Sequence, residues 1–290
     1  MTLHQRLAEA RARLAASGIR PDEAALDVDL YARTILGWDR ARLLAAQREV
    51  EPPQLEPRFS DWISRRERRE PTAYITGVRE FWGLEFAVTP AVLIPRPETE
   101  FVVEEALALA RATPTPLVAD IGTGSGCVAV AIAHECGACR VVATDISRDA
   151  IAVARANAVR HGVADRIAFV VTSYLDGVAG RFDVIAANPP YVRDGDEPAL
   201  AAAVRYEPGV ALFGGAEGFR DIAGVLDASL GVLAEGGWLV MEFGYGQQEH
   251  LEALVAARPG LAMVRVREDL QGIPRTAIIR RGLRRVRALG

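Results

Sequence analysis

The chain has 290 residues, half of them hydrophobic and a quarter charged, which is enough for about two folded domains and too apolar for broad disorder. All 34 basic residues are arginine, so a Walker-type phosphate loop, a Schiff-base mechanism and a lysine general base are excluded. A net charge of −4 argues against a protein that covers nucleic acid over a wide face. No apolar run is long enough to span a bilayer and no signal peptide begins the chain, so we expect a cytoplasmic protein.

The first 72 residues are predicted to form a small helical domain. Apolar residues recur at helical spacing over 3–17, Pro21 opens a second helix, and Asp39 caps a short third one. A fourth helix ends in the arginine-rich run 65–69, which we interpret as a solvated helix end. This domain, residues 1–72, contains no group of residues that is typical of a catalytic site.

Residues 73–97 are predicted to be a linker. Within it, residues 87–94 are typical of two short strands around a proline turn, which would form a β-hairpin. The hairpin leads into Pro-Arg-Pro-Glu-Thr-Glu at 95–100, after which a helix begins. Thr99 or the glutamate before it is the expected N-cap of that helix.

A glycine-rich loop is predicted at the end of the next buried strand. The strand contains Asp120 and is followed directly by the loop 122–126, Gly-Thr-Gly-Ser-Gly. The third glycine comes one residue earlier than in the dinucleotide fingerprint, which argues against NAD. The following strand ends in Asp145, which is placed to accept both hydroxyl groups of an adenosine ribose. The alternative is that Asp145 caps the helix beginning at Ser147.

A rigid corner is predicted at Asn188-Pro189-Pro190-Tyr191. The apolar run 181–187 before it is typical of a short buried strand. Pro189 restricts Asn188 to an extended backbone, and neither proline has an N–H group to donate. A planar amide, two carbonyl groups and an aromatic ring are then expected where open α/β sheets bind their ligands. These groups are suited to bind a flat, neutral amide or amine. The alternative interpretation of the motif is an ordinary proline-rich turn after a strand.

From residue 98 to residue 290, strands alternate with helices, which predicts an α/β fold with a doubly wound sheet covered on both faces. Two other patterns are interpreted as structure. Cys136 and Cys139, with His134 nearby, resemble half of a zinc site but lack a second pair of ligands, so we expect a surface turn and no metal. The basic C-terminal stretch is read as a solvated terminus, and its residues are Arg280, Arg281, Arg284, Arg285 and Arg287.

Together these stretches resemble the S-adenosylmethionine-dependent methyltransferases, and most closely the peptide chain release factor glutamine methyltransferases (the HemK/PrmC family). The segment 94–100, Ile-Pro-Arg-Pro-Glu-Thr-Glu, is the most specific feature. The other features that carry the resemblance are 71–83, 120–126, Asp145, 188–191, Glu207-Pro208 with Gly214-Gly215, and 242–244. The resemblance implies a Rossmann-like domain with a mostly parallel seven-stranded sheet at 98–290. Along the chain, this domain follows the helical domain and the hairpin linker.

The resemblance also implies roles for particular residues. It implies a cofactor site for S-adenosylmethionine, formed by Asp120, Gly122, Thr123, Gly124, Ser125, Gly126, Asp145, Tyr174 and Asn188. Asp145 would hold the ribose, and Tyr174 would pack against the adenine. It implies a substrate site at Asn188, Pro189, Pro190 and Tyr191, where Asn188 and the Pro189 carbonyl would receive the substrate N–H groups. Tyr191 would form a wall of this catalytic site. Ser173 stands where the family usually has an acid, which implies weaker cofactor binding.

The implied activity is methylation of the side-chain amide nitrogen of the glutamine in the GGQ motif of class-1 peptide chain release factors. The helical domain would recognise this protein substrate, and we expect a monomer with no direct contact to DNA or membrane. Alternatives are methylation of a ribosomal protein glutamine, methylation of adenine N6 in DNA, and a non-catalytic binding module. A DNA enzyme would carry a basic recognition region, which this sequence lacks.

Overall fold

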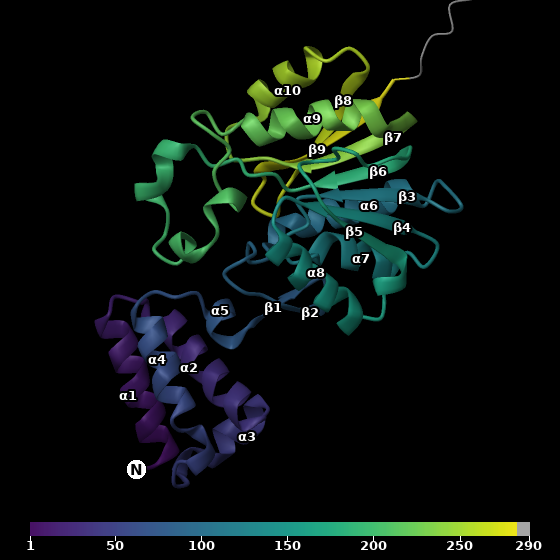
Figure 1. The fold of residues 1–290 in the computed structure, drawn as a ribbon. Coiled ribbons are helices and arrows are strands. Elements are labelled where there is room, and N and C mark those ends of the chain that lie inside the picture. Colours follow the sequence, from purple (N-terminus) through teal and green to yellow (C-terminus); the bar gives the residue numbers. More distant parts are fainter. Residues whose placement is uncertain (283–290) are drawn as a thin grey trace, which may run out of the picture. The chain divides into compact units, whose positions relative to one another are not determined.

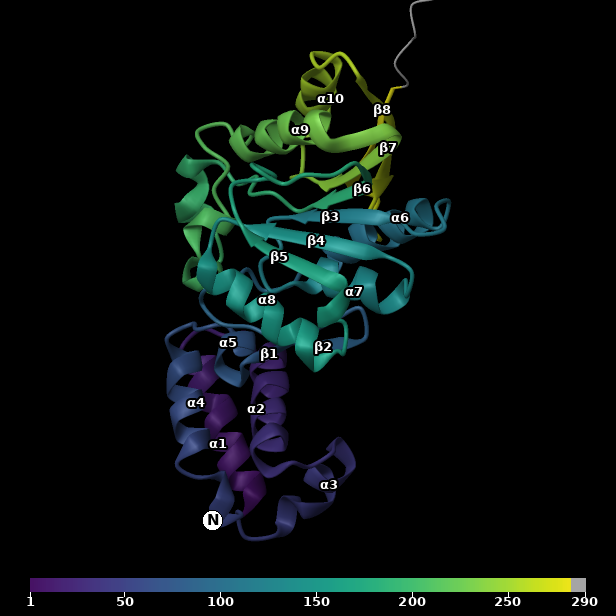
Figure 2. The ribbon, with the colours of Figure 1, turned by 45° about the vertical axis from the view of Figure 1, so that its right-hand side comes forward.

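A computed structural model describes residues 1–282 (Figures 1 and 2), so three of the C-terminal arginines, Arg284, Arg285 and Arg287, lie outside the described residues. The chain forms two compact units. The smaller unit contains residues 1–78 together with 201–206, and the larger one contains 79–200 and continues from residue 207. The chain therefore passes from one unit to the other three times.

The smaller unit is helical. Its helices are α1 (Leu3–Ala16), α2 (Pro21–Leu36), α3 (Arg40–Ala45), α4 (Arg58–Glu67) and α5 (Thr72–Thr76). A capping box between Thr2 and Gln5 begins α1, and Gly37 ends α2 in the left-handed conformation. The apolar faces of the helices share one core that includes Leu7, Tyr31 and Phe59, all fully buried.

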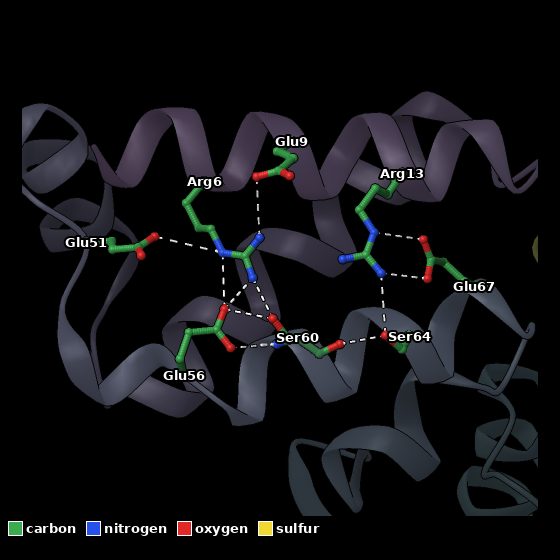
Figure 3. Close-up of polar contacts among 8 residues, drawn as sticks. All are labelled: Arg6, Glu9, Arg13, Glu51, Glu56, Ser60, Ser64 and Glu67. Atoms are coloured by element: carbon green, nitrogen blue, oxygen red, sulfur yellow. Dashed lines mark hydrogen bonds and ion pairs between the residues drawn. The ribbon is translucent and has the colours of Figure 1, made fainter. Parts of the chain in front are cut away.

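Polar contacts join α1 to α4 and to the turn before it (Figure 3). Arg6 donates to the carboxylate of Glu56 and, over 2.6 Å, to the hydroxyl of Ser60. Two turns further along α1, Arg13 binds Glu67 through two hydrogen bonds of 2.9 and 2.8 Å. Paired guanidinium–carboxylate bonds fix direction as well as distance, so these contacts set the register of α1 against α4.

The arginine run 65–69 was interpreted as a solvated helix end, and for Arg66 this is wrong. Arg66 is 5% exposed, and its Nε donates to Asp27 of α2 over 2.7 Å. The hydroxyl of Thr72 donates to the other oxygen of Asp27, also over 2.7 Å. The buried ion pair satisfies polar groups that burial would otherwise penalise. It thereby ties α2, α4 and α5 together.

The β-hairpin lies earlier in the chain than the predicted 87–94. Its strands are β1 (Val78–Phe81) and β2 (Leu84–Ala87), and residues 88–94 form no strand. Trp82 and Gly83 at its tip have φ angles of 56° and 68°. Two successive left-handed residues are typical of the tight turn that matches the twist of a hairpin. Tryptophan rarely adopts a positive φ, so the pair Trp82-Gly83 is not a usual turn signal, whereas the proline at position 90 is a common one.

The larger unit contains a seven-stranded sheet with the strand order β5-β4-β3-β6-β7-β9-β8. Its strands are β3 (Leu117–Ile121), β4 (Arg140–Asp145), β5 (Ile167–Val171), β6 (Phe182–Ala187), β7 (Leu233–Glu242), β8 (Leu261–Glu268) and β9 (Pro274–Arg281). The first five strands in this order pair in parallel, and β9 pairs antiparallel with both β7 and β8. The predicted doubly wound, mostly parallel sheet is confirmed.

Helices cover both faces of this sheet (Figures 1 and 2). One core receives α6 (Glu100–Ala110), α7 (Cys127–Glu135), α8 (Arg148–Arg160) and the hairpin, and the other receives α9 (Arg220–Val232) and α10 (Gln248–Ala256). Successive residues of a strand point to opposite faces. In β6, Val184 and Ala186 therefore enter the first core, while Ile185 and Ala187 enter the second.

The turn predicted at Cys136 and Cys139 contains a disulfide that the sequence analysis does not predict. Cys136 and Cys139 form a disulfide in the turn between α7 and β4, with Cα atoms 5.4 Å apart. Within residues 1–282, no group of three or more histidine, cysteine or acidic side chains is placed to hold a metal ion. In the same part of the chain, no helix combines the length and the apolar character needed to cross a membrane.

Candidate active site

A cavity of about 420 Å³ opens at the carboxyl ends of β3, β4, β5 and β6. All residues that line it belong to the larger unit. They come from the segment 91–99, the end of β3 with the glycine loop, the ends of β4 and β5, the Asn-Pro-Pro corner, residues 208–211, and the helices that follow the glycine loop, β4 and residue 219. Its size is in the usual range for a cavity that binds a small molecule.

The glycine loop bends sharply at the end of β3. Gly122, Gly124 and Gly126 have φ angles of 71°, 54° and 81°, a conformation that other residues rarely adopt. Gly122 and Gly124 line the cavity together with Thr123 and Ser125. Gly126 does not belong to the lining among the described residues; a Cβ atom there would lie 3.0 Å from the Cα of Ala154 in α8. The third glycine therefore serves the packing of two helices.

Asp120 lies beneath the loop. Its Oδ2 accepts hydrogen bonds from the hydroxyl of Thr123 over 2.6 Å and from the backbone N–H of Ala129 over 3.1 Å. Burial raises the pKa of Asp120 to about 7, because the charged form loses its hydration. The carboxyl group thus links the loop to the first turn of α7.

Asp145 stands at the end of β4, beside the loop. Its two oxygens accept backbone hydrogen bonds, one from Gly124 and one from Ser147, both over 2.9 Å. Burial raises the pKa of Asp145, and the two N–H donors oppose that shift. The cap of α8 is instead the Ser147 hydroxyl, which accepts from the N–H of Ala150. Asp145 lines the cavity and is therefore available to a ligand there.

Tyr174 lines the cavity beyond β5, next to Ser173. Its backbone is in the left-handed region, with φ at 46°, and its carbonyl accepts from the hydroxyl of Thr144 over 2.6 Å. The phenol group donates to Asp221 of α9 over 2.9 Å. The ring packs so closely against Gly224 that a Cβ atom there would meet it at 2.3 Å. The tyrosine is thus held between β4 and α9.

The Asn-Pro-Pro-Tyr corner follows β6 as predicted. Asn188, Pro189 and Pro190 line the cavity, whereas Tyr191 is not part of the lining among the described residues. The phenol group of Tyr191 instead donates to Oε1 of Glu242 over 3.1 Å. The structure therefore brings the amide and both prolines to the cavity and places the aromatic ring behind them.

Three buried polar residues, of which Thr99 lines the cavity, make contacts that no local sequence pattern predicted. Thr99 was expected to cap α6, but its hydroxyl makes no capping bond and donates to Oε2 of Glu242 over 2.7 Å. Glu207 is buried, accepts from the N–H of Ile94 over 3.0 Å and pairs with Arg96. Glu242 ends the strand next to β6, so the rule that ligands bind at the carboxyl ends of parallel strands could have indicated it. Glu207 carries part of the family resemblance, but no local pattern predicted its ion pair with Arg96.

The sheet order and its cavity define the class of protein. Residues 103–206 match the methyltransferase small domain, and residues 5–77 match the PrmC N-terminal domain. The fold is similar to that of the hMettl16 catalytic domain solved in complex with MAT2A 3'UTR hairpin 6, with a TM-score of 0.57 and 18% identity, over 76% of this chain and 82% of that one. This chain is a methyltransferase.

Two curated relatives narrow the assignment. The release factor glutamine methyltransferase of Bradyrhizobium diazoefficiens is 41% identical over 264 residues, which cover 90% of this chain and 89% of that protein. The protein of the same name from Moorella thermoacetica is 41% identical over 262 residues, covering 89% and 90%. This chain belongs to the release factor glutamine methyltransferase family. These names do not favour the ribosomal-protein or DNA alternatives.

Proposed function

We propose that this protein transfers a methyl group from S-adenosylmethionine to the side-chain amide nitrogen of the GGQ glutamine in class-1 peptide chain release factors. One cavity contains both a candidate cofactor site and a candidate substrate site, and this observation carries the proposal. Asp145 and the glycine loop lie on one side, and the Asn188 amide lies on another. We further propose that the reaction takes place in the cytoplasm, where release factors act, and that a single chain carries it out.

The residues around the glycine loop fit the cofactor. The hydroxyl of Ser125 lines the cavity, is buried and has no hydrogen-bond partner, so a bound polar group would satisfy it. Open space lies above Gly122, where a Cβ atom would meet nothing within 4 Å. Asp145 would accept the ribose hydroxyl groups, and Tyr174 would flank the adenine. When bound, the cofactor supplies an electrophilic methyl group on a positively charged sulfur.

The Asn-Pro corner fits an amide as the nucleophile. An amide nitrogen reacts poorly because its lone pair is delocalised into the carbonyl group. The side-chain oxygen of Asn188 and the carbonyl of Pro189 would accept its two N–H groups and turn the lone pair toward the methyl group. Such a site would accelerate the reaction by position and electrostatics, so no general base is needed before transfer. As the methyl–nitrogen bond forms, the methyl–sulfur bond breaks, the sulfonium leaves as a neutral thioether, and the nitrogen then loses one of its protons to solvent.

We also propose a division of tasks along the chain. Residues 1–72 would recognise the release factor, 73–97 would join the domains, and 98–290 would bind the cofactor and transfer the methyl group. A single side-chain amide offers little binding energy for choosing among proteins. Recognition of the intact factor therefore requires a surface beyond the cavity, and the helical unit supplies a folded one.

Mass spectrometry of a class-1 release factor incubated with the protein and isotopically labelled S-adenosylmethionine tests the activity. We expect a single labelled methyl group on the GGQ glutamine. Asn188→Ala should bind the cofactor nearly normally and lose on the order of 10²–10³ in turnover, as when one preorganised polar group is removed. A release factor that stays unlabelled, or a label on another residue, would contradict the proposal.

A further inference from the structure

A chain of buried hydrogen bonds runs away from the cavity behind Asn188. The Nδ2 of Asn188 donates to the Thr99 hydroxyl over 2.9 Å, and that hydroxyl donates to Oε2 of Glu242 over 2.7 Å. On the other side, the Tyr191 phenol donates to Oε1 of Glu242 over 3.1 Å. Thr99 is 2% exposed and Glu242 is 1% exposed, so both side chains depend on protein partners for their hydrogen bonds.

The direction of this chain follows from counting protons. Burial raises the pKa of Glu242, and the hydrogen bonds from Thr99 and Tyr191 oppose that shift by stabilising the charged form. In that form Glu242 only accepts hydrogen bonds, and each of its oxygens has a hydroxyl donor. The single proton of Thr99 is therefore committed to Glu242, and toward Asn188 the threonine oxygen can only accept. Only the NH₂ end of the Asn188 amide can donate a hydrogen bond to this threonine oxygen. The carbonyl end of Asn188 is then left to face the cavity.

The surrounding segments hold this arrangement in place. Thr99 ends a short 3₁₀ turn (Pro97–Thr99), and Arg96 just before that turn pairs with the buried Glu207. The backbone carbonyl of Tyr191 accepts from Nε2 of Gln247 over 3.0 Å. The charges near Glu242 are those of Glu98 and Arg275. Two segments of the chain, 97–99 and 188–191, thus meet at the carboxyl group of Glu242.

We propose that Glu242, acting through Thr99, fixes which end of the Asn188 amide faces the cavity and so makes the site accept N–H groups and reject carboxylates. The inference rests on the proposed function. It adds a physical reason why the site would bind a glutamine side chain in preference to a glutamate side chain. Glu242 and Thr99 are positioning residues, because they are proposed to act through the side chain of Asn188. Without them the Asn188 amide is free to turn over, and its NH₂ group would then repel the substrate amide and attract a carboxylate.

Thr99→Val keeps the shape of the side chain and removes the hydroxyl, while Thr99→Ser restores the hydroxyl and serves as the rescue. We expect Thr99→Val to lose roughly 10- to 100-fold in kcat, as is usual when a supporting polar partner of a site is removed. Its affinity for S-adenosylmethionine should stay within about twofold of the wild type, and Thr99→Ser should recover most of the kcat. Glu242→Gln should lose less kcat than Thr99→Val, because its single amide oxygen can still accept from one of the two hydroxyl groups, that of Thr99 included.

A second measurement separates positioning from a general structural defect. Calorimetry compares the binding of a short GGQ peptide with that of the same peptide carrying glutamate in place of glutamine. The wild type should prefer the glutamine peptide, and this preference should shrink in both Thr99→Val and Glu242→Gln. An unchanged kcat, or an unchanged preference between the peptides, would overturn the inference. If the wild type methylates no release factor, the proposed function fails instead, while the peptide preference still tests the amide orientation.

Discussion

The carboxylate of Asp145 already accepts two backbone hydrogen bonds, from Gly124 and Ser147. These donors fix its orientation at the edge of the cavity and leave room on each oxygen for a further donor. A ribose with two adjacent hydroxyl groups has the matching geometry. The position of this one side chain therefore links the glycine loop, the start of α8 and the proposed cofactor site.

Asp145→Ala is expected to weaken the binding of S-adenosylmethionine by tenfold or more. Each hydrogen bond to a charged acceptor contributes about 1.5–3 kcal/mol, and the variant also releases the N–H of Gly124 in the loop. Isothermal calorimetry measures the change. Asp149→Ala is the matched control, because Asp149 is an exposed acid outside the cavity lining. An affinity equal to that of the wild type would remove Asp145 from the site.

Asp120 is expected to make the stability of the protein depend on pH. Its pKa is raised to about 7 in the folded chain by burial, well above the ordinary value of about 3.9 in an unfolded chain. The folded state therefore holds the proton more tightly than the unfolded state. This contribution to stability is fully present below the unfolded pKa and is lost as pH rises through about 7.

Urea unfolding between pH 4 and pH 8 tests this expectation. The free energy of unfolding should fall more steeply with pH in the wild type than in Asp120→Asn, whose amide oxygen still accepts from Thr123 and Ala129. The raised pKa values of Asp145 and Glu242 have the same sign and are present in both proteins. Parallel pH profiles would show that Asp120 does not carry the effect.

At the scale of the element, the glycine loop matters for packing as well as for ligands. Gly126→Ala is expected to destabilise the protein by at least about 2 kcal/mol, because it combines a strained left-handed φ with a contact of 3.0 Å to Ala154. Gly231→Ala in α9 is the matched control: a Cβ atom there meets nothing within 4 Å, so it should stabilise by about 0.4–1 kcal/mol. Urea unfolding of both variants checks the difference. Equal effects would contradict the packing role.

The buried pair between Arg66 and Asp27 gives a second expectation for the elements. Arg66→Met should destabilise the helical unit by about 3–5 kcal/mol, because it leaves the carboxylate of Asp27 buried without its cation. The exposed neighbour Arg68 offers the control, since Arg68→Met should stay within about 0.5 kcal/mol of the wild type. Thermal unfolding followed by circular dichroism distinguishes them. Replacing both Arg66 and Asp27 with apolar residues should cost less than Arg66→Met alone.

Local signals account for most of the fold that was predicted. The alternation of strands and helices, the loop 122–126 and the double proline at 189–190 depend on short-range sequence patterns, and the structure shows each of them. The contact between Thr99 and Glu242 was not predicted, since 143 residues separate them and only the assembled fold brings them together. The same holds for Arg66, whose burial depends on a partner 39 residues away. Sequence patterns describe elements well and long-range polar partners poorly.

At the scale of the whole molecule, the choice of substrate should depend on more than the cavity. We expect kcat/KM for an intact release factor to exceed that for a short GGQ peptide by roughly 10²-fold or more, because the peptide lacks the recognition surface that the helical unit is proposed to bind. Steady-state kinetics of the unaltered protein with both substrates measures the ratio. Equal values would show that the cavity alone selects the substrate.

The segment 201–206 belongs to the helical unit, although it lies far from residues 1–78 in the chain. In it, the phenol group of Tyr206 donates to the carbonyl of Arg68 over 2.6 Å. A ribosome makes the chain from the N-terminus, at roughly 5–20 residues per second. The helical unit therefore emerges first but receives its last residues only after strands β3 to β6 have been made. Nascent chains that end before residue 201 carry an unfinished helical unit, so its completion and the assembly of the sheet overlap during synthesis.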